Sequence, residues 1–247
     1  MFKENLKNII DRIDLSESQM SEMFTDIFSG NVTDIQIGAM MTALAAKGET
    51  FEELAGAARA MRRKAHRIQA PSAIIVDTCG TGGDASQTFN ISTTTAFIVA
   101  GCGVTVAKHG NRSVSSQCGS ADLLEVLGVK LDTDPEIVEE AVQEIGIGFL
   151  FAPLYHSAMR FAAKARAEVG LRSIFNMLGP LTNPAGANCQ LLGVFAPHLT
   201  EMFAEALRHD LFPDRDAAHL AAVIAAFVNE QPTEGTLPPA MLPGPLR

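Results

Sequence analysis

Three segments between Val76 and Gly119 are rich in glycine, hydroxyl, amide and cationic groups. Glycines let backbone N–H groups close on an anion, and the N-terminus of a helix favours phosphate. Each segment adjoins an apolar run, so its polar groups lie at the ends of predicted strands and helices. The three segments are Gly80-Thr81-Gly82-Gly83-Asp84, Asn90-Ile91-Ser92-Thr93-Thr94-Thr95 and Lys108-His109-Gly110-Asn111-Arg112-Ser113. Together they predict a ligand that carries several phosphates.

The alternative for any one of these loops is a tight turn between a strand and a helix. Short glycine patterns match such turns about as often as they match phosphate sites. Three loops with the same chemistry, followed by further hydroxyl groups at Ser115, Ser116 and Ser120, favour phosphate binding over three unrelated turns.

Alternating strands and helices must position these loops. Apolar runs predict strands at 73–76, 104–107, 148–151 and 190–195, and helices at 96–101, 121–127, 134–144, 157–169 and 199–207. This order predicts an α/β fold with a mostly parallel sheet flanked by helices, in which the carboxyl ends of the strands share one edge. Ala152, Pro153 and His156 follow the strand at 148–151, so we expect them at the same edge.

Residues 1–70 predict helices only, in a small separate domain. A stripe of methionine and phenylalanine runs along the second helix, as a core or as a partner surface. Asp34 is the predicted cap of the third helix, and Thr50 with Glu53 forms a capping box for the fourth. We therefore predict a helical domain over 1–70, an α/β domain over 71–208 and a divergent proline-rich tail over 209–247.

The composition argues against several classes of protein. The chain has 247 residues, 47% of them hydrophobic, and a net charge of −9, which argues against a general nucleic-acid surface. Its four cysteines are widely spaced, which favours free thiols in a cytoplasmic protein over a disulfide framework or a zinc site. No apolar run is long enough to predict a membrane span.

The loop motifs resemble those of the anthranilate phosphoribosyltransferase family, whose members act in tryptophan biosynthesis. The resemblance covers about residues 1–208 and extends to two further stretches, Gly119-Ser120-Ala121-Asp122-Leu123-Leu124-Glu125 and Phe175-Asn176-Met177-Leu178-Gly179-Pro180-Leu181-Thr182-Asn183-Pro184. It implies transfer of the phosphoribosyl group of 5-phosphoribosyl 1-pyrophosphate to anthranilate, with Mg²⁺ as cofactor and a homodimer joined through the helical domain.

The same resemblance implies roles for individual residues. Ser92 would touch one Mg²⁺. Anthranilate would meet Gly80, Asn111 and Arg166, near His109, Ala152, Pro153 and His156. A planar guanidinium such as that of Arg166 also suits a carboxylate on chemical grounds. The implied ligands of phosphoribosyl pyrophosphate are Gly80, Gly83, Asp84, Thr88, Asn90, Ile91, Ser92, Thr93, Lys108, Gly110, Asn111, Arg112, Ser113, Val114, Ser115, Ser116 and Ser120.

Phosphoribosyl transfer needs no covalent nucleophile, because an aromatic amine is already a free base near neutral pH. Catalysis can then rest on positioning and on stabilising the charge of the leaving pyrophosphate. His109 is a candidate proton acceptor, and the alternative is a loop histidine that is hydrogen-bonded to backbone. Two other functions stay open: a pyrimidine-nucleoside phosphorylase, and a phosphoribosyl-pyrophosphate-binding protein without turnover.

The sequence changes character after residue 208. An alanine-rich helix is predicted over 216–228, and proline is frequent beyond it. The family resemblance implies a further strand and an adjacent Asp-Glu pair for a second Mg²⁺ in this part, and no such pair follows residue 208. We therefore expect a truncation or a frame change near residue 209, an incomplete sheet and low turnover; the alternative is a natural variant with a different terminus.

Overall fold

The computed structural model describes residues 1–70, 72–82, 89–113, 118–211 and 223–226. The predictions for most of the tail lie outside these residues. So do those for Gly83, Asp84, Thr88, Val114, Ser115 and Ser116.

The amino-terminal part consists of four helices, α1 (Phe2–Ile10), α2 (Glu17–Phe28), α3 (Asp34–Lys47) and α4 (Phe51–Lys64). Capping boxes begin α2, α3 and α4, since in each a side-chain oxygen accepts the N3 backbone N–H. The predicted box of Thr50 and Glu53 is confirmed. The prediction for Asp34 is wrong, because Thr33 is the N-cap and Asp34 is the first helical residue.

The methionine stripe of α2 is core. Met20, Met23 and Phe24 are fully buried, and α2 packs closely on α4. The crossing depends on Gly56 of α4, where an added Cβ would lie 2.3 Å from the carbonyl oxygen of Glu17. None of the described helices is both long and apolar enough to cross a bilayer.

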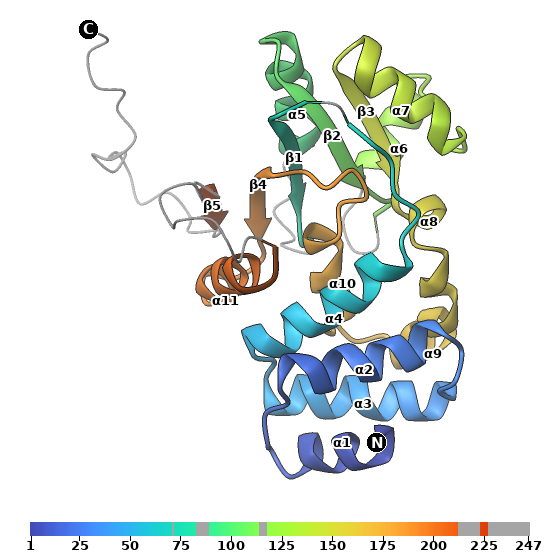
Figure 1. The fold of residues 1–247 in the computed structure, drawn as a ribbon, viewed down its shortest axis with the longest axis vertical. Helices are drawn as coiled ribbons and strands as arrows, with labels where there is room; N and C mark the ends of the chain where they lie inside the picture. Colours follow the sequence, from blue (N-terminus) through green and yellow to red (C-terminus); the bar gives the residue numbers. More distant parts are fainter. Residues whose placement is uncertain (71, 83–88, 114–117, 212–222, 227–247) are drawn as a thin grey trace, which may run out of the picture.

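The described strands form one parallel sheet in the order β3-β2-β1-β4-β5. They are β1 (Ile75–Gly80), β2 (Thr105–Gly110), β3 (Ile147–Phe151), β4 (Cys189–Val194) and β5 (Val223–Ala226). The predicted α/β class with a separate helical part is confirmed (Figure 1). Helix α5 (Ile91–Gly101) joins β1 to β2, and α6 (Ser120–Val126) and α7 (Pro135–Glu144) join β2 to β3.

The link from β3 to β4 returns to the helical part. It contains α8 (Ala152–Tyr155), the 3₁₀ turn η1 (Ser157–Met159), α9 (Arg160–Val169), α10 (Phe175–Leu178) and the 3₁₀ turn η2 (Gly179–Leu181). The single helix predicted over 157–169 is therefore wrong in its first turn, which is 3₁₀. Helix α9 packs on α2 and α3, so the helical layer includes residues well beyond 70 (Figure 1).

One hydrophobic core joins the two layers. It runs from α2, α3 and α4 through α9 and α10 to β4 and to α11 (Leu199–Ala206), which the π-turn η3 (Leu207–Leu211) follows. Phe24 and Phe175 meet in it with ring centroids 5.1 Å apart. The helical part is therefore fixed against the sheet by shared burial.

The helix predicted over 216–228 is wrong at 223–226, where the chain forms β5. Alanine favours a helix locally, but Val223 and Ile224 favour a strand, and β4 offers an edge to pair with. Pairing with β4 decides the conformation of this segment.

Candidate functional site

The carboxyl ends of β1, β2 and β3 lie at one edge of the sheet. Gly110 at the end of β2 pairs in register with Phe151 at the end of β3. The order of the strands reverses beside β1: β2 and β3 continue on one side of it, and β4 and β5 on the other. Open α/β sheets bind ligands in the crevice at such a reversal.

The ends of β1 and β4 approach each other closely at this reversal. Gly80 of β1 and Gly193 of β4 are partners in register, and a Cβ on Gly80 would lie 3.2 Å from the carbonyl oxygen of Gly193. Thr81 donates its N–H to the same carbonyl at 2.9 Å, and its Oγ1 accepts the N–H of Phe195 at 3.0 Å. The first predicted phosphate loop thus leaves the sheet at the reversal point.

Lys108 is buried beneath the start of α5. Its ammonium group donates to the carbonyl oxygen of Thr78 and, at 3.3 Å, to Oγ of Ser92. Burial lowers the pKa of Lys108, and the negative charge of Asp77 opposes that shift. Burial raises the pKa of the Asp77 carboxyl, and the charge of Lys108 opposes the rise. A buried cation therefore lies directly behind the second predicted phosphate loop.

His109 and His156 lie together behind the sheet edge, with ring centroids 5.0 Å apart. Nδ1 of His109 is 3.0 Å from the carbonyl oxygen of Gly179, so Nδ1 carries the proton and Nε2 is the acceptor. Burial is the main cause that lowers the pKa of His109 to about 4 and that of His156 to about 3. Both rings are neutral at pH 7, and buried Nε2 of His109 has no partner among the described residues.

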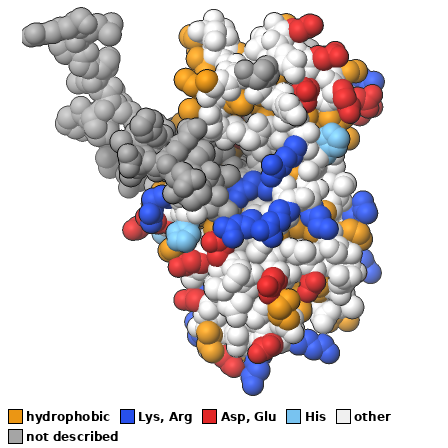
Figure 2. All heavy atoms as spheres, in the orientation of Figure 1, with side chains coloured by type: hydrophobic (Ala, Val, Ile, Leu, Met, Phe, Trp, Pro, Cys, Tyr) orange, Lys and Arg blue, Asp and Glu red, His pale blue; other side chains and the backbone are white. Residues whose placement is uncertain are grey.

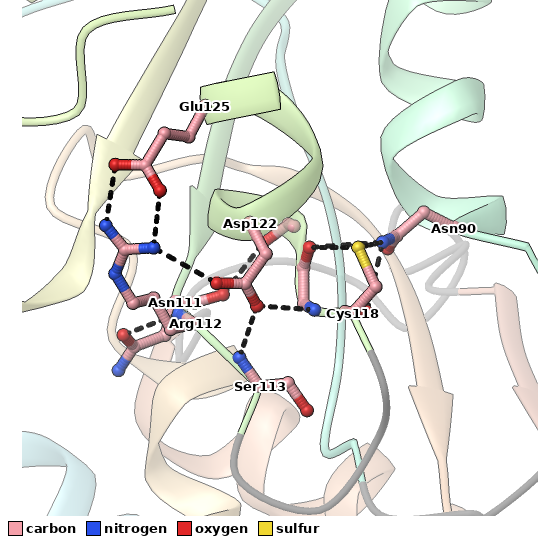
Figure 3. A network of polar contacts seen from close by, with 9 residues as sticks. Asn90, Asn111, Arg112, Ser113, Cys118, Asp122 and Glu125 are labelled. Atoms are coloured by element: carbon pink, nitrogen blue, oxygen red, sulfur yellow. Dashed lines mark hydrogen bonds and ion pairs between the residues drawn. The ribbon is translucent and has the colours of Figure 1, made fainter. Parts of the chain in front are cut away.

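The third predicted loop is attached to α6 and to the start of α5 (Figure 3). Arg112 forms a two-pronged ion pair with Glu125, at 2.7 and 2.8 Å, and contacts Asp122 at 3.1 Å. Asn90 is the N-cap of α5, but it makes no side-chain cap bond, and its amide donates to the carbonyl oxygen of Gly119 at 3.1 Å. Oγ of Ser120 donates to the carbonyl oxygen of Asn111 at 3.3 Å.

Arg166 lies on α9, apart from the strand ends. Its guanidinium is over the ring of Phe175, 5.5 Å from the centroid, and burial lowers its pKa. Phe175 opens α10, which leads directly to Gly179 and its contact with His109. Arg166 and His109 are thus connected through one short stretch of chain.

The structure brings most described site residues to one edge. The phosphate residues at the ends of β1 and β2 and at the starts of α5 and α6 lie there, with Ala152, Pro153 and His156 after β3. Sequence patterns predict no role for Asp77, Gly179 or Asn183, although Asn183 donates its amide to the carbonyl oxygen of Ala107 in β2 at 2.8 Å. The stretch 175–184 stands out in the sequence only as a family motif. Its contacts with β2, through Gly179 and Asn183, follow from no local pattern in the sequence.

The predicted position offers few ligand atoms for a metal ion. Ser92 offers a single hydroxyl oxygen, and the Lys108 ammonium is 3.3 Å from it. Within the described residues, no group of three His, Cys, Asp or Glu side chains could hold a metal ion. Mg²⁺ prefers carboxylates together with phosphates of a substrate. The described residues therefore do not themselves build a magnesium site.

Basic side chains form a band on the molecule despite its net charge of −9. Figure 2 shows Lys and Arg side chains crossing the middle of one face, at the height of α4 and α10. The last turn of α4 contains three basic residues, Arg62, Arg63 and Lys64, and Arg62 donates to the carbonyl oxygen of Leu181 at 3.1 Å. A local positive band of this kind suits an anionic ligand.

Comparisons with known protein families give two matches. Residues 72–218 match the description "Glycosyl transferase family, a/b domain", and residues 3–65 match "Glycosyl transferase family, helical bundle domain". The two matches correspond to the sheet and to the amino-terminal helices.

Similar individual proteins share one name. The chain is 74% identical over 208 residues to the anthranilate phosphoribosyltransferase of Syntrophobacter fumaroxidans, a match covering 84% of this chain and 62% of that protein. It is 73% identical to that of Desulfosudis oleivorans, covering 84% and 61%. The chain thus spans less than two thirds of the length of these relatives.

Two solved structures have the same fold. The anthranilate phosphoribosyltransferase of Thermus thermophilus superposes with a TM-score of 0.79 at 46% identity, covering 83% of this chain and 62% of that one. The enzyme of Saccharomyces cerevisiae, in complex with PRPP and Mg, superposes with a TM-score of 0.79 at 28% identity, covering 86% and 63%.

Proposed function

Because the chain belongs to the glycosyl transferase family, we propose that it transfers the phosphoribosyl group of phosphoribosyl pyrophosphate to anthranilate. The products are N-(5-phosphoribosyl)anthranilate and pyrophosphate, in tryptophan biosynthesis. One observation carries the proposal: phosphate donors at the ends of β1 and β2 and at the starts of α5 and α6 lie at the edge where the neutral His109–His156 pair is found. The shared name of the relatives at 74% and 73% identity supports the choice of substrates.

The phosphate loops would stabilise the charge that develops on the leaving pyrophosphate. In the proposed site, the backbone N–H groups after β1 and the first turn of α5 face the phosphates. Lys108 contributes a positive charge whose effect is strengthened by burial. We propose that Mg²⁺ enters with the donor as the counter-ion of its phosphates, since the described residues form no metal cluster.

The aromatic amine would attack from the side of the two histidines. The bond from anthranilate nitrogen to ribose C1 forms, the bond from C1 to pyrophosphate oxygen breaks, and the nitrogen loses a proton. His109 supports this step because its ring is neutral and its Nε2 is an acceptor. Asn111 and Gly80 are the further proposed contacts of anthranilate.

The test pairs a binding measurement with a turnover assay on the full chain. Calorimetry with phosphoribosyl pyrophosphate and MgCl₂ should give saturable binding, and adding anthranilate should yield N-(5-phosphoribosyl)anthranilate and pyrophosphate, which chromatography detects. Binding without product would favour the alternative of a phosphoribosyl-pyrophosphate-binding protein that does not catalyse the transfer. Phosphorolysis of a pyrimidine nucleoside would favour the phosphorylase. The absence of both binding and product would contradict the proposal.

Replacing Arg166 with Ala should weaken anthranilate binding selectively. A charge-assisted hydrogen bond contributes about 1.5–3 kcal/mol, so the KM for anthranilate should rise about tenfold to a hundredfold. Binding of phosphoribosyl pyrophosphate should stay nearly unchanged. Arg166→Lys should restore only part of the loss, because lysine lacks the planar fork. An equal loss for both substrates would instead assign Arg166 a folding role.

We also propose a cytosolic homodimer joined through the helical part. Ile35 in the first turn of α3 is 86% exposed and borders a hollow between α3 and α9 lined by Gly38, Ala39 and Ala43. An exposed apolar surface of this kind fits a second copy. Free thiols at all four cysteines fit a reducing compartment. Sedimentation of a monomer at micromolar concentration would contradict the dimer.

A further inference from the structure

We infer that Asp122 and Glu125 of α6 are positioning residues, which hold Ser113, Gly119 and Arg112 in the arrangement that receives phosphate. The inference deepens the proposed function and rests on it. Both acidic residues lie in the motif at 119–125, for which the family resemblance implies no role of either carboxylate.

Asp122 ties together two parts of the chain that are six residues apart. Its Oδ2 accepts the backbone N–H of Ser113 at 2.9 Å and that of Gly119 at 2.8 Å (Figure 3). These bonds lower the pKa of Asp122, so it accepts them as a carboxylate at neutral pH. One carboxylate oxygen therefore fixes the distance between Ser113 and the start of α6.

Gly119 lies too close to the backbone of residues 111–113 for any side chain at position 119. A Cβ on Gly119 would lie 2.4 Å from the nitrogen of Ser113 and 2.8 Å from the carbonyl oxygen of Asn111. Asn90 adds a third connection, because its amide donates to the carbonyl oxygens of Gly119 and Cys118. The start of α5 and the start of α6 are thus held at a fixed separation.

Glu125 fixes the direction of the Arg112 guanidinium. Its two carboxylate oxygens accept from Nη1 at 2.7 Å and Nη2 at 2.8 Å, and Oδ1 of Asp122 accepts from Nη1 at 3.1 Å. A guanidinium held on one edge by two carboxylates loses little further rotational freedom when its remaining N–H groups bind a ligand. Arg112 is therefore held in place before the phosphate arrives.

Whether ligand binding becomes tighter or weaker when a carboxylate charge is removed tests this role. A carboxylate near an anionic ligand repels it, so removing the charge should tighten binding if electrostatics alone mattered. If the carboxylates position the donors, removing the charge should weaken binding despite the lost repulsion. Positioning and simple charge effects thus predict opposite changes.

The experiment compares Asp122→Asn and Glu125→Gln with two control variants, Asp132→Asn and Glu140→Gln, which change exposed acids outside this network. Calorimetry with phosphoribosyl pyrophosphate and MgCl₂ should show binding about five- to twentyfold weaker for the first pair, the scale of losing one or two hydrogen bonds to a charged group. The controls should bind as the parent does, and thermal unfolding should find all four variants folded. Equal or tighter binding by both Asp122→Asn and Glu125→Gln would overturn the inference.

A second measurement needs no ligand. Amide hydrogen exchange at Ser113 and Gly119 should become faster in Asp122→Ala, because alanine has no acceptor for the two N–H groups, while exchange in the β2 strand stays unchanged. Unchanged protection at both amides would overturn the inference on its own. A parent chain that binds no phosphoribosyl pyrophosphate, together with faster exchange in this variant, would reject the proposed function and leave the positioning geometry supported.

Discussion

Replacing Lys108 with Met is expected to lower the free energy of unfolding by about 3–5 kcal/mol, the scale of leaving the buried Asp77 carboxylate without the opposite charge that lowers its pKa. Asp77 is fully buried, and its Oδ1 accepts the backbone N–H of His109 at 3.0 Å. Without the Lys108 ammonium, this carboxylate must either stay charged in an apolar setting or take up a proton. Binding of phosphoribosyl pyrophosphate should be lost together with the buried cation.

The double variant Lys108→Met with Asp77→Asn separates the two effects. Asn keeps an oxygen that accepts the His109 N–H and carries no charge, so much of the lost stability should return while ligand binding stays weak. Urea unfolding gives the stability and calorimetry the binding. Lys130→Met, at an exposed position, is the control for losing a lysine. A loss below about 1 kcal/mol in Lys108→Met, the range of an exposed ion pair, would contradict this assignment.

Lowering the pH from 7 to 5 is expected to destabilise the protein by about 2 kcal/mol for each of His109 and His156. In the folded protein their pKa values are about 4 and about 3, below the usual 6.5. The unfolded chain therefore binds more protons than the folded one in this window. The contribution of each neutral ring is fully present above pH 6.5 and is lost as the pH falls toward the folded pKa.

Urea unfolding at several pH values, in parent and variant, measures this loss. In His109→Asn the side-chain amide can still donate to the carbonyl oxygen of Gly179, but it does not titrate, so the slope of stability against pH should be smaller. His198→Asn changes an exposed histidine and is the matched control. The same slope in His109→Asn as in the parent would show that His109 does not cause the acid sensitivity.

The strand–loop–helix order was predictable because its signals are local. The apolar run of β1 leads to Gly80, and Asn90 precedes the apolar run of α5; the structure ends the strand and begins the helix at these residues. Boundaries were less accurate: β1 was predicted at 73–76 and extends to Gly80, and Thr33 rather than Asp34 caps α3. Neighbouring cap residues compete, and a sequence alone does not decide between them.

The environment of the site was not predictable, because it depends on contacts between distant residues. The tautomer of His109 is set by Gly179, seventy positions later, and the attraction between the charges of Lys108 and Asp77 arises only once β1 and β2 are adjacent. Similarly, β5 depends on the free edge of β4, whereas the alanines of this segment favour a helix. The domain boundaries and the roles of individual site residues remain predictions.

The glycine pair that joins the ends of β1 and β4 restricts how chains with this sheet can diverge. Gly80 and Gly193 are partners in register, and a Cβ on Gly80 would lie 3.2 Å from the carbonyl oxygen of Gly193. A larger residue at position 80 would therefore push the two strands apart where the first predicted phosphate loop begins. A change of ligand preference is then easier to reach through side chains at the end of β2 or at the start of α6 than through this pair.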